Sequence, residues 1–578
     1  MKKTAVLLLL LLFVTVQTAG ATVVDTKAPY FGDFLFVYNN TDADVTLSPQ
    51  VSDSLKNTLT MSRMSDADEC VEERIHWSPD CSDLSLPTGF ATVTPASVQK
   101  TPILFALFSP DVGDTVTYLV SNPLTGTGYN QDFIYMATGQ YCNIMVEPDA
   151  EGTPKISAED AQKIATEFDN HIQPFMVENF GDYYTYLGTK YAFVNGRIQE
   201  VLDGVENTKM NILLYDIQDG YNGTTNRSYV GGYTSLSDFI SENLGGNGNE
   251  QGILHIDIYP LMGTSGSPDV TKAYSTIVHE FQHQISYSDS LFDYFRGATS
   301  YYINDTWWNE AFSLAAEHLY TGSPLTYRIN SYNQTNNSTP LRNGLVLGYL
   351  NYSENNDNVA SNYGASYLFG QYLRCQTKHL EGGGNRIYRT VLEQVGTDYT
   401  AILSALSSIE YEYAPESFEE LYRNFRMATV LKDSTGPYGF AGESTFSTLA
   451  HNAYTGIANL TLKPGAAVVL MDAENFLPEN ENLSYVAFSD RGDFTYELNA
   501  VSDSIVNVTH GTLPLEGATL LAAGYNEQHK LLGVDEITTF SSDEENYSYT
   551  LPQGSVIRKF FLFTKDGTMK PLSVAGIQ

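Results

Sequence analysis

The sequence predicts an α+β protein of several domains. Short runs of β-branched and aromatic residues, separated by Gly, Pro, Asn and Asp, fill residues 22–149 and return from residue 434 onward. Between them, over residues 150–433, apolar residues recur mainly at helical spacing. We expect a β-sandwich-like N-terminal domain that could be a pro-region, a central domain of a small sheet and a helical lobe, and a β-rich C-terminal domain at residues 434–578.

The first 21 residues have the composition of a signal peptide. Two lysines precede an apolar run from Ala5 to Val16, and the Ala-Gly-Ala sequence at residues 19–21 fits the small-residue rule for cleavage. The run is short for a membrane span, and no stop-transfer pattern follows it. We therefore expect a secreted or periplasmic protein that has no integral membrane segment after cleavage.

The chain is strongly acidic, with 31 basic and 68 acidic residues and a formal charge of −37. Such a surface repels phosphate backbones and anionic membranes, and the sequence has no local basic patch. We expect a protein or peptide as partner and no nucleic acid, and we expect a monomer.

Four cysteines lie in a chain that is directed to an oxidising compartment. Cys70 and Cys81 are close enough in sequence to form a local disulfide. Whether Cys142 pairs with Cys375 is left open. None of the four has the spacing of a metal site.

The segment AYSTIVHEFQH, which begins at Ala273, contains an HExxH motif. On a helix, His279 and His283 project from one face, so both imidazoles could bind one metal ion. Glu280 lies beside them and could act as general base on a metal-bound water, as in zinc hydrolases. Two strand patterns precede the motif, and if the second, GILHIDIY, is the edge of the sheet, a substrate peptide could pair with it as an added strand.

A catalytic zinc needs a third protein ligand, and two candidates imply different classes of peptidase. In metzincins the motif continues to a glycine and then to a His or Asp, but Ser286 stands at the glycine position, followed by Asp289. In gluzincins the third ligand is a glutamate on a second helix, and TWWNEAFSLAAEHLY supplies Glu310 there. Glu317 lies two turns further along that helix, where it either hydrogen-bonds a ligand histidine or is a solvated carboxylate.

HEFQH and WWNEAFSLAAEHL, with NILLYDIQDGYNG upstream and NYGASYLFGQYL downstream, resemble the hyicolysin family of secreted bacterial neutral zinc metallopeptidases. The resemblance covers roughly residues 105–435. It implies a gluzincin with zinc ligands at His279, His283 and Glu310 and a catalytic glutamate at Glu280.

Two further assignments complete the predicted site. A hydrogen-bond donor should face the oxyanion, and Tyr363 and Tyr367 are the candidates, with Tyr363 first because related clans place a tyrosine at a similar distance beyond the third ligand. Asp216, Asp219, Gly220 and Asn222 resemble part of a calcium loop, with a simple turn as the alternative.

The sequence thus predicts a secreted zinc endopeptidase. The aminopeptidase branch is less consistent with it, because the GxMEN segment of those enzymes is absent. Two alternatives stay open: an inactive adhesin or binding protein on a peptidase scaffold, and a metzincin-like peptidase that uses Asp289.

Overall fold

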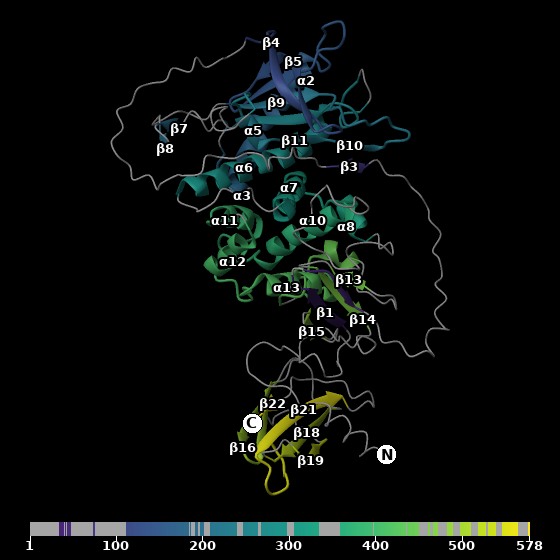
Figure 1. Cartoon of the computed structure of the whole chain (residues 1–578), viewed down its shortest axis with the longest axis vertical. Coiled ribbons are helices and arrows are strands. Elements are labelled where there is room, and N and C mark those ends of the chain that lie inside the picture. Colours follow the sequence, from purple (N-terminus) through teal and green to yellow (C-terminus); the bar gives the residue numbers. More distant parts are fainter. Residues whose placement is uncertain are drawn as a thin grey trace.

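The computed structural model shows an α+β protein with several sheets and a helical lobe (Figure 1). The predicted signal peptide and the predicted Cys70–Cys81 disulfide lie outside the described residues. The structure describes residues 34–39, 41, 43–47, 73–75, 111–183, 185, 191–194, 197–200, 209–239, 247–263, 267–296, 306–333, 359–396, 398–434, 436–449, 460–462, 466–471, 483–488, 497–509, 518–526, 530–538, 546–564 and 576–577.

The largest sheet has six strands in the order β11–β12–β9–β6–β5–β4. The three inner strands β6, β9 and β12 are parallel, whereas β11 and the β4–β5 hairpin pair antiparallel to their neighbours. The strands are β4 (Thr115–Asn122), β5 (Thr127–Thr138), β6 (Cys142–Val146), β9 (Met210–Tyr215), β11 (Gly232–Thr234) and β12 (Ile253–Asp257).

Both faces of this sheet are covered. Because side chains alternate along a strand, Ile212 and Leu214 of β9 join the core shared with the helices, while Leu213 and Tyr215 join a second core on the other face. The inner strands therefore consist almost entirely of buried residues, which is typical of parallel strands.

The strand order of this sheet bears on two points of the sequence analysis. The predicted boundary between residues 149 and 150 would divide it, because β6 pairs in parallel with β9 across that boundary. The segment GILHIDIY is not the edge, because β12 lies between β9 and β11. The short strand β11, which the sequence pattern did not indicate, takes the edge position.

The helices from α6 to α13 form the lobe beneath the sheet in Figure 1, whereas α2 lies beside the strands. Predicted capping residues begin two of them, since Ser157 accepts a hydrogen bond from the Asp160 backbone and Ser417 from the Glu420 backbone. The helices are α2 (Ala158–Glu167), η1 (Phe168–Ile172), α3 (Gln173–Phe180), α5 (Leu236–Phe239), η3 (Val270–Ala273), α6 (Tyr274–Arg296), α7 (Thr306–Thr321), α8 (Thr326–Asn333), α10 (Val359–Gln376), η4 (Gly384–Arg386), α11 (Ile387–Leu392), α12 (Tyr399–Ser408), α13 (Phe418–Leu431) and η5 (Ser444–Thr448).

Smaller sheets join distant parts of the chain. β1 (Phe34–Asn39) is the central strand between β14 (Ala467–Met471) and β15 (Leu483–Phe488), and β2 (Val45–Leu47) pairs with β13 (Leu460–Leu462). Phe36 of β1 is fully buried in the helical core, with its ring against Tyr422. The remaining pairs outside the C-terminal region are β3 (Glu73–Ile75) with β10 (Ser228–Val230), and β7 (Tyr191–Val194) with β8 (Arg197–Glu200).

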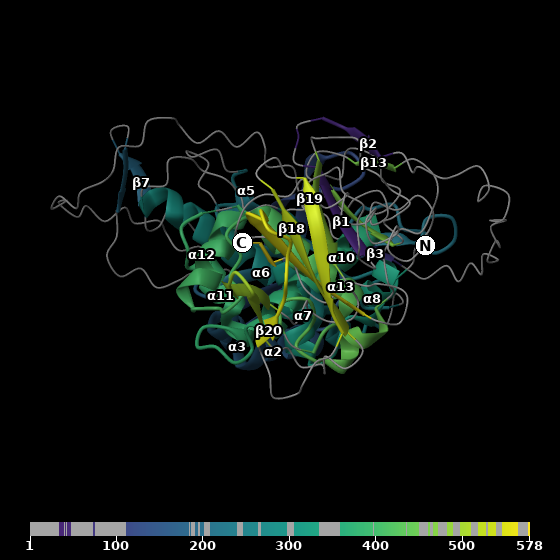
Figure 2. The same ribbon diagram turned by 90° about the horizontal axis from the view of Figure 1, so that it is seen from below.

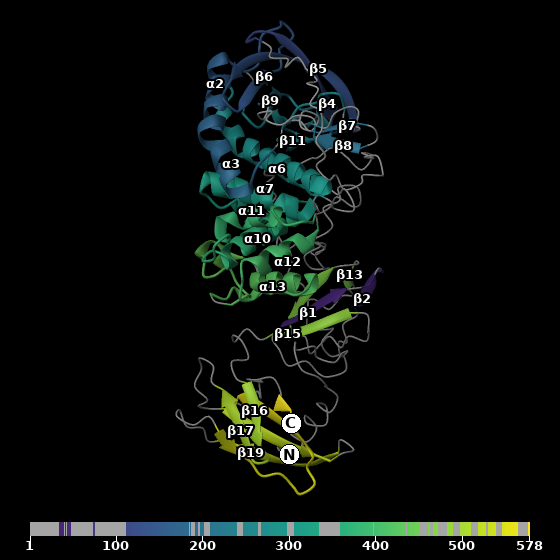
Figure 3. The ribbon, with the colours of Figure 1, turned by 90° about the vertical axis from the view of Figure 1, so that its left-hand side faces the viewer.

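The C-terminal strands form two sheets that share one core, and a smaller apolar cluster lies on β18 and β21, in keeping with the β-rich region that the sequence predicted. Figures 1 and 3 show these strands at the opposite end from β4 and β5, and in Figure 2 β18 and β19 lie nearest the viewer. The strands are β16 (Glu497–Ser502), β17 (Ile505–Thr509), β18 (Ala518–Tyr525), β19 (Leu531–Ile537), β20 (Asn546–Ser548), β21 (Ile557–Thr564) and β22 (Gly576–Ile577).

Two further observations bear on the sequence predictions. Cys142 and Cys375 are buried free thiols, so the pairing left open between them does not form. Within the described ranges, no helix combines the length and the apolar character that crossing a membrane requires.

Helix α10 packs against α7 through a glycine. A Cβ added to Gly370 would lie 2.7 Å from the backbone oxygen of Ala311, which is closer than carbon and oxygen normally approach. We expect Gly370→Ala to lower the free energy of unfolding by about 1–3 kcal/mol because the helices must separate. Urea denaturation measures this change.

Ser404→Ala is the matched control, because Ser404 is exposed on α12. Its free energy of unfolding should change by no more than about 0.5 kcal/mol. Equal stability of the two variants would contradict the close packing of α7 and α10.

Candidate metal centre

Helix α6 carries the HExxH motif, and its position is fixed by the capped turn before it and by the residues it buries. It follows η3, whose N-cap Asp269 accepts a hydrogen bond from the backbone of Thr271. Ile277, Val278 and Phe281 are fully buried in the core that the sheet and helices share. The motif histidines therefore sit on a helix whose position is fixed by the sheet above it and by α7 beside it.

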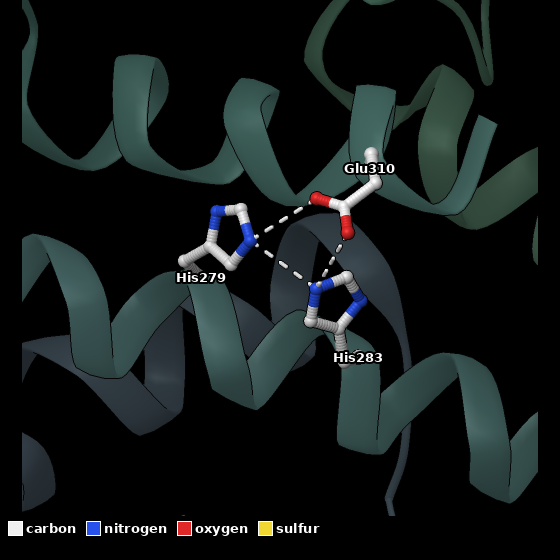
Figure 4. Close-up of side chains that lie close together, drawn as sticks. All are labelled: His279, His283 and Glu310. Atoms are coloured by element: carbon white, nitrogen blue, oxygen red, sulfur yellow. Dashed lines mark hydrogen bonds and ion pairs between the residues drawn. The ribbon is translucent and has the colours of Figure 1, made fainter. Parts of the chain in front are cut away.

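The side chains of His279, His283 and Glu310 converge between α6 and α7 (Figure 4). The two Nε2 atoms are 3.2 Å apart. Glu310 Oε2 lies 3.4 Å from His279 Nε2, and Glu310 Oε1 lies 3.8 Å from His283 Nε2. All three residues are buried, and their candidate ligand atoms lie within 4.8 Å of one another.

Polar side chains contact the Nδ1 atom of each histidine, on the opposite side of the ring from Nε2. Glu317 Oε1 lies 2.9 Å from His279 Nδ1, so the carboxylate can accept the Nδ1 proton. Asn309 Oδ1 lies 3.2 Å from His283 Nδ1, and Ser313 Oγ lies 3.1 Å from the same atom. These contacts direct both Nε2 atoms toward Glu310.

Burial and neighbouring charge shift the pKa values of the group in different directions. Burial alone lowers the pKa of His279, but the carboxylates of Glu310 and Glu317 outweigh it and raise that pKa to about 9. Burial lowers the pKa of His283 to about 4, aided by the charge on His279 and against the carboxylate of Glu310. Burial raises the pKa of Glu310, but the two histidines outweigh it and leave that pKa below its ordinary value.

The group fits a metal ion. Glu310 Oε2 is buried without a hydrogen-bond partner although it faces His279 Nε2 at 3.4 Å, and a buried carboxylate oxygen normally has a partner. Two imidazole nitrogens and one carboxylate oxygen are also a donor set found in catalytic zinc sites, which keep one position open. His279, His283 and Glu310 could therefore hold a metal ion.

Glu280 and Tyr363 lie next to this group. Glu280 is buried on α6 below β11, where a Cβ added to Gly232 would lie 3.1 Å from Glu280 Cγ. Tyr363 on α10 donates a hydrogen bond of 3.4 Å to Glu310 Oε1. The hydroxyl of Tyr367, the second candidate, instead contacts His318 Nδ1 at 2.7 Å and accepts from the Leu325 backbone, so it belongs to a different network.

The alternative third ligand, Asp289, lies elsewhere. The metzincin pattern requires the chain to leave the helix after His283, but α6 continues without a break to Arg296. Asp289 is half-buried on that helix and is not part of the convergent group. Among the described residues, His279, His283 and Glu310 are the one set of His, Cys, Asp or Glu side chains whose ligand atoms lie close enough together to bind one metal ion.

The predicted calcium loop is a turn in the structure. Asp219 accepts hydrogen bonds from the backbones of Tyr221 and Val230, and Asn222 accepts from the backbones of Thr224, Thr225 and Asn226. These bonds account for the side-chain oxygens of Asp219 and Asn222 without an ion, as in a turn.

Sequence reasoning missed Ser313 and Arg328. Ser313 could have been found, because it lies one turn after Asn309 on the face of α7 that meets His283. No motif or spacing in the sequence indicates that Arg328 on α8 lies near the site. Its guanidinium carbon lies 4.7 Å from the centroid of the Tyr363 ring, its Nε and Nη2 have no hydrogen-bond partners, and its charge helps to lower the pKa of Glu310.

The fold and this group define an α+β protein with a buried site that could hold a metal, in which Glu280 adjoins two histidines. No family model matches the chain. The chain is 31% identical to the neutral metalloprotease ShpI of Staphylococcus hyicus over 355 residues, which are 60% of this chain and 71% of ShpI. The chain therefore belongs to the family of neutral metalloproteases that includes ShpI.

Metal binding should release a proton. His279 has a pKa of about 9 in the metal-free chain and is protonated at pH 7, whereas a metal ligand must be deprotonated. We expect about one proton to leave per bound ion at pH 7, and metal affinity to rise as pH increases toward 9 and then level off. Calorimetric titration of the metal-free chain with Zn²⁺ in two buffers of different ionisation enthalpy measures the release. Identical binding enthalpies would contradict it.

Two substitutions separate the candidate third ligands. Glu310→Gln should lower metal affinity by more than the roughly 10–100-fold that is typical of residues behind the ligands, because it removes a ligand charge. Asp289→Asn should keep the wild-type metal content. The metal content of both variants is measured after dialysis against a weak chelator. Loss of metal from Asp289→Asn alone would show that Asp289, and not Glu310, is the third ligand.

Proposed function

We propose that this protein is an exported, zinc-dependent endopeptidase of the gluzincin type, similar to the hyicolysins. The observation that carries the proposal is the buried convergence of His279, His283 and Glu310 beside Glu280, in a chain that belongs to the neutral metalloprotease family. His279, His283 and Glu310 would hold the zinc. The substrate would be a protein or peptide.

A zinc ion held by His279, His283 and Glu310 would supply Lewis acidity for the scissile carbonyl and would lower the pKa of a water molecule from about 15.7 to about 7. Glu280 takes a proton from the attacking water and delivers it to the nitrogen of the leaving amine. Glu317 fixes the ring of His279, while Asn309 and Ser313 fix that of His283. The Tyr363 hydroxyl, which lies against Glu310, turns to donate to the carbonyl oxygen as that oxygen gains charge.

The edge strand β11 is the proposed binding place for the substrate backbone. It is the terminal strand of the central sheet in the described part of the chain, and Gly232 brings it close to Glu280. An extended peptide that adds to this edge is recognised through its main chain and extends in both directions past Glu280. This arrangement suits cleavage within a chain.

Glu280→Gln tests the catalytic role. The amide is nearly isosteric but cannot accept the proton, so kcat on casein or a quenched peptide should fall by about 10²–10⁴-fold. Zinc content should stay at one ion per chain, because Glu280 is not one of the convergent ligand residues. Both quantities are measured on the purified variant and the wild type.

A wild type that holds stoichiometric zinc but cleaves no member of a peptide library would refute the peptidase proposal. That result would favour the alternative of a binding protein on a peptidase scaffold. Unchanged turnover by Glu280→Gln would instead refute only the role of Glu280.

A further inference from the structure

A short strand from the N-terminal region pairs with the chain next to the proposed substrate edge. β3 runs parallel to β10, with Glu73 opposite Ser228, Arg74 opposite Tyr229 and Ile75 opposite Val230. In Figure 1, β3 lies on the side of β10 that faces the helical lobe, away from β4 and β5.

β10 leads directly into the edge strand of the central sheet. Only Gly231 separates β10 from β11, and its carbonyl oxygen accepts a hydrogen bond from the Asp257 backbone on β12. At about 3.3 Å per strand residue, Val230 lies within about 7 Å of Gly232 along the chain. Gly232 is the residue whose added Cβ would approach Glu280 Cγ to 3.1 Å. β3 therefore pairs with the backbone that leads directly into the proposed substrate edge.

We propose that β3 is an internal competitor of the substrate, which occupies the β10 end of the substrate edge until the N-terminal region is cut. This inference rests on the proposed peptidase function. The pairing ends at Val230, two residues before Gly232, so none of the peptide bonds of Glu73–Ile75 lies opposite Gly232. β3 thus blocks the substrate-binding position beside Ser228–Val230, while its own peptide bonds stay away from Glu280 and are not cleaved.

Strand β1 limits how the block can be removed. β1 pairs along its length with β14 and β15, and Phe36 is fully buried against Tyr422 in the helical core. Loss of β1 would leave β14 and β15 without their shared partner and would open a cavity at Phe36. Activation therefore cuts the chain between β1 and β4 and leaves β1 in the active protein as a tightly held fragment.

The test compares Arg74→Pro with Arg74→Ala in the full uncleaved chain, using a quenched peptide of about ten residues that spans both sides of the cleavage point. Proline removes a backbone N–H and fixes φ, which weakens strand pairing, whereas alanine keeps the backbone unchanged. We expect Arg74→Pro to raise kcat/KM about tenfold or more over wild type, and Arg74→Ala to stay within about threefold of it.

A second measurement keeps the test independent of misfolding. A synthetic peptide of residues 71–79 should inhibit the Arg74→Pro chain competitively, and the same peptide with proline at position 74 should not. Equal kcat/KM for all three chains, with no inhibition by the peptide, would overturn this inference while leaving the peptidase function intact. Absence of cleavage by every chain, each with bound zinc, would instead refute the peptidase function itself.

Mass spectrometry of the active secreted protein tests the retention of β1. Under denaturing conditions a fragment that contains residues 34–39 should be found with the larger chain. Native gel filtration should not separate the two. An active protein that lacks this fragment would overturn the retention of β1.

Discussion

The contact between α6 and α7 is the interaction on which the site depends. It brings two imidazoles and a carboxylate together in a buried space, where an ionised group without a partner is costly. Fully buried Ala311, Ala315 and Ala316 let α7 approach its neighbours closely, and Gly370 does the same from α10. The polar network of Glu317, Asn309 and Ser313 then uses the remaining hydrogen-bonding capacity of both histidines.

The sheet organises the rest of the site. Its parallel strands are buried on both faces and fix the start of α6, while its edge strand β11 lies over Glu280. The edge strand of a sheet has backbone N–H and C=O groups that no further strand of that sheet pairs with, and such an edge can bind either a substrate or another part of the same chain. Family membership, the convergent donor group and this edge are the three observations that support the proposed hydrolysis of an extended peptide beside a metal.

Segments from both ends of the chain contribute to the central architecture. β4, β5 and β6 extend the sheet that carries the catalytic helix, and β1 completes a sheet with β14 and β15 more than 400 positions later in the chain. The predicted division into consecutive domains did not anticipate this, because strand composition indicates that a segment is β but not which strand it pairs with. Pairing is set by burial and backbone hydrogen bonding over long sequence separations.

The sequence by itself determined the local features: the four-residue spacing of His279 and His283, the helix that carries Glu310 and Glu317 two turns apart, and the serine caps of α2 and α13. These follow from helix periodicity and capping, which act within a few residues. Only the tertiary structure placed Glu310 rather than Asp289 beside the histidines, Tyr363 rather than Tyr367 against Glu310, and β11 rather than β12 at the edge. Each of these depends on how separate elements pack, and neither the spacing nor the composition of one segment specifies that.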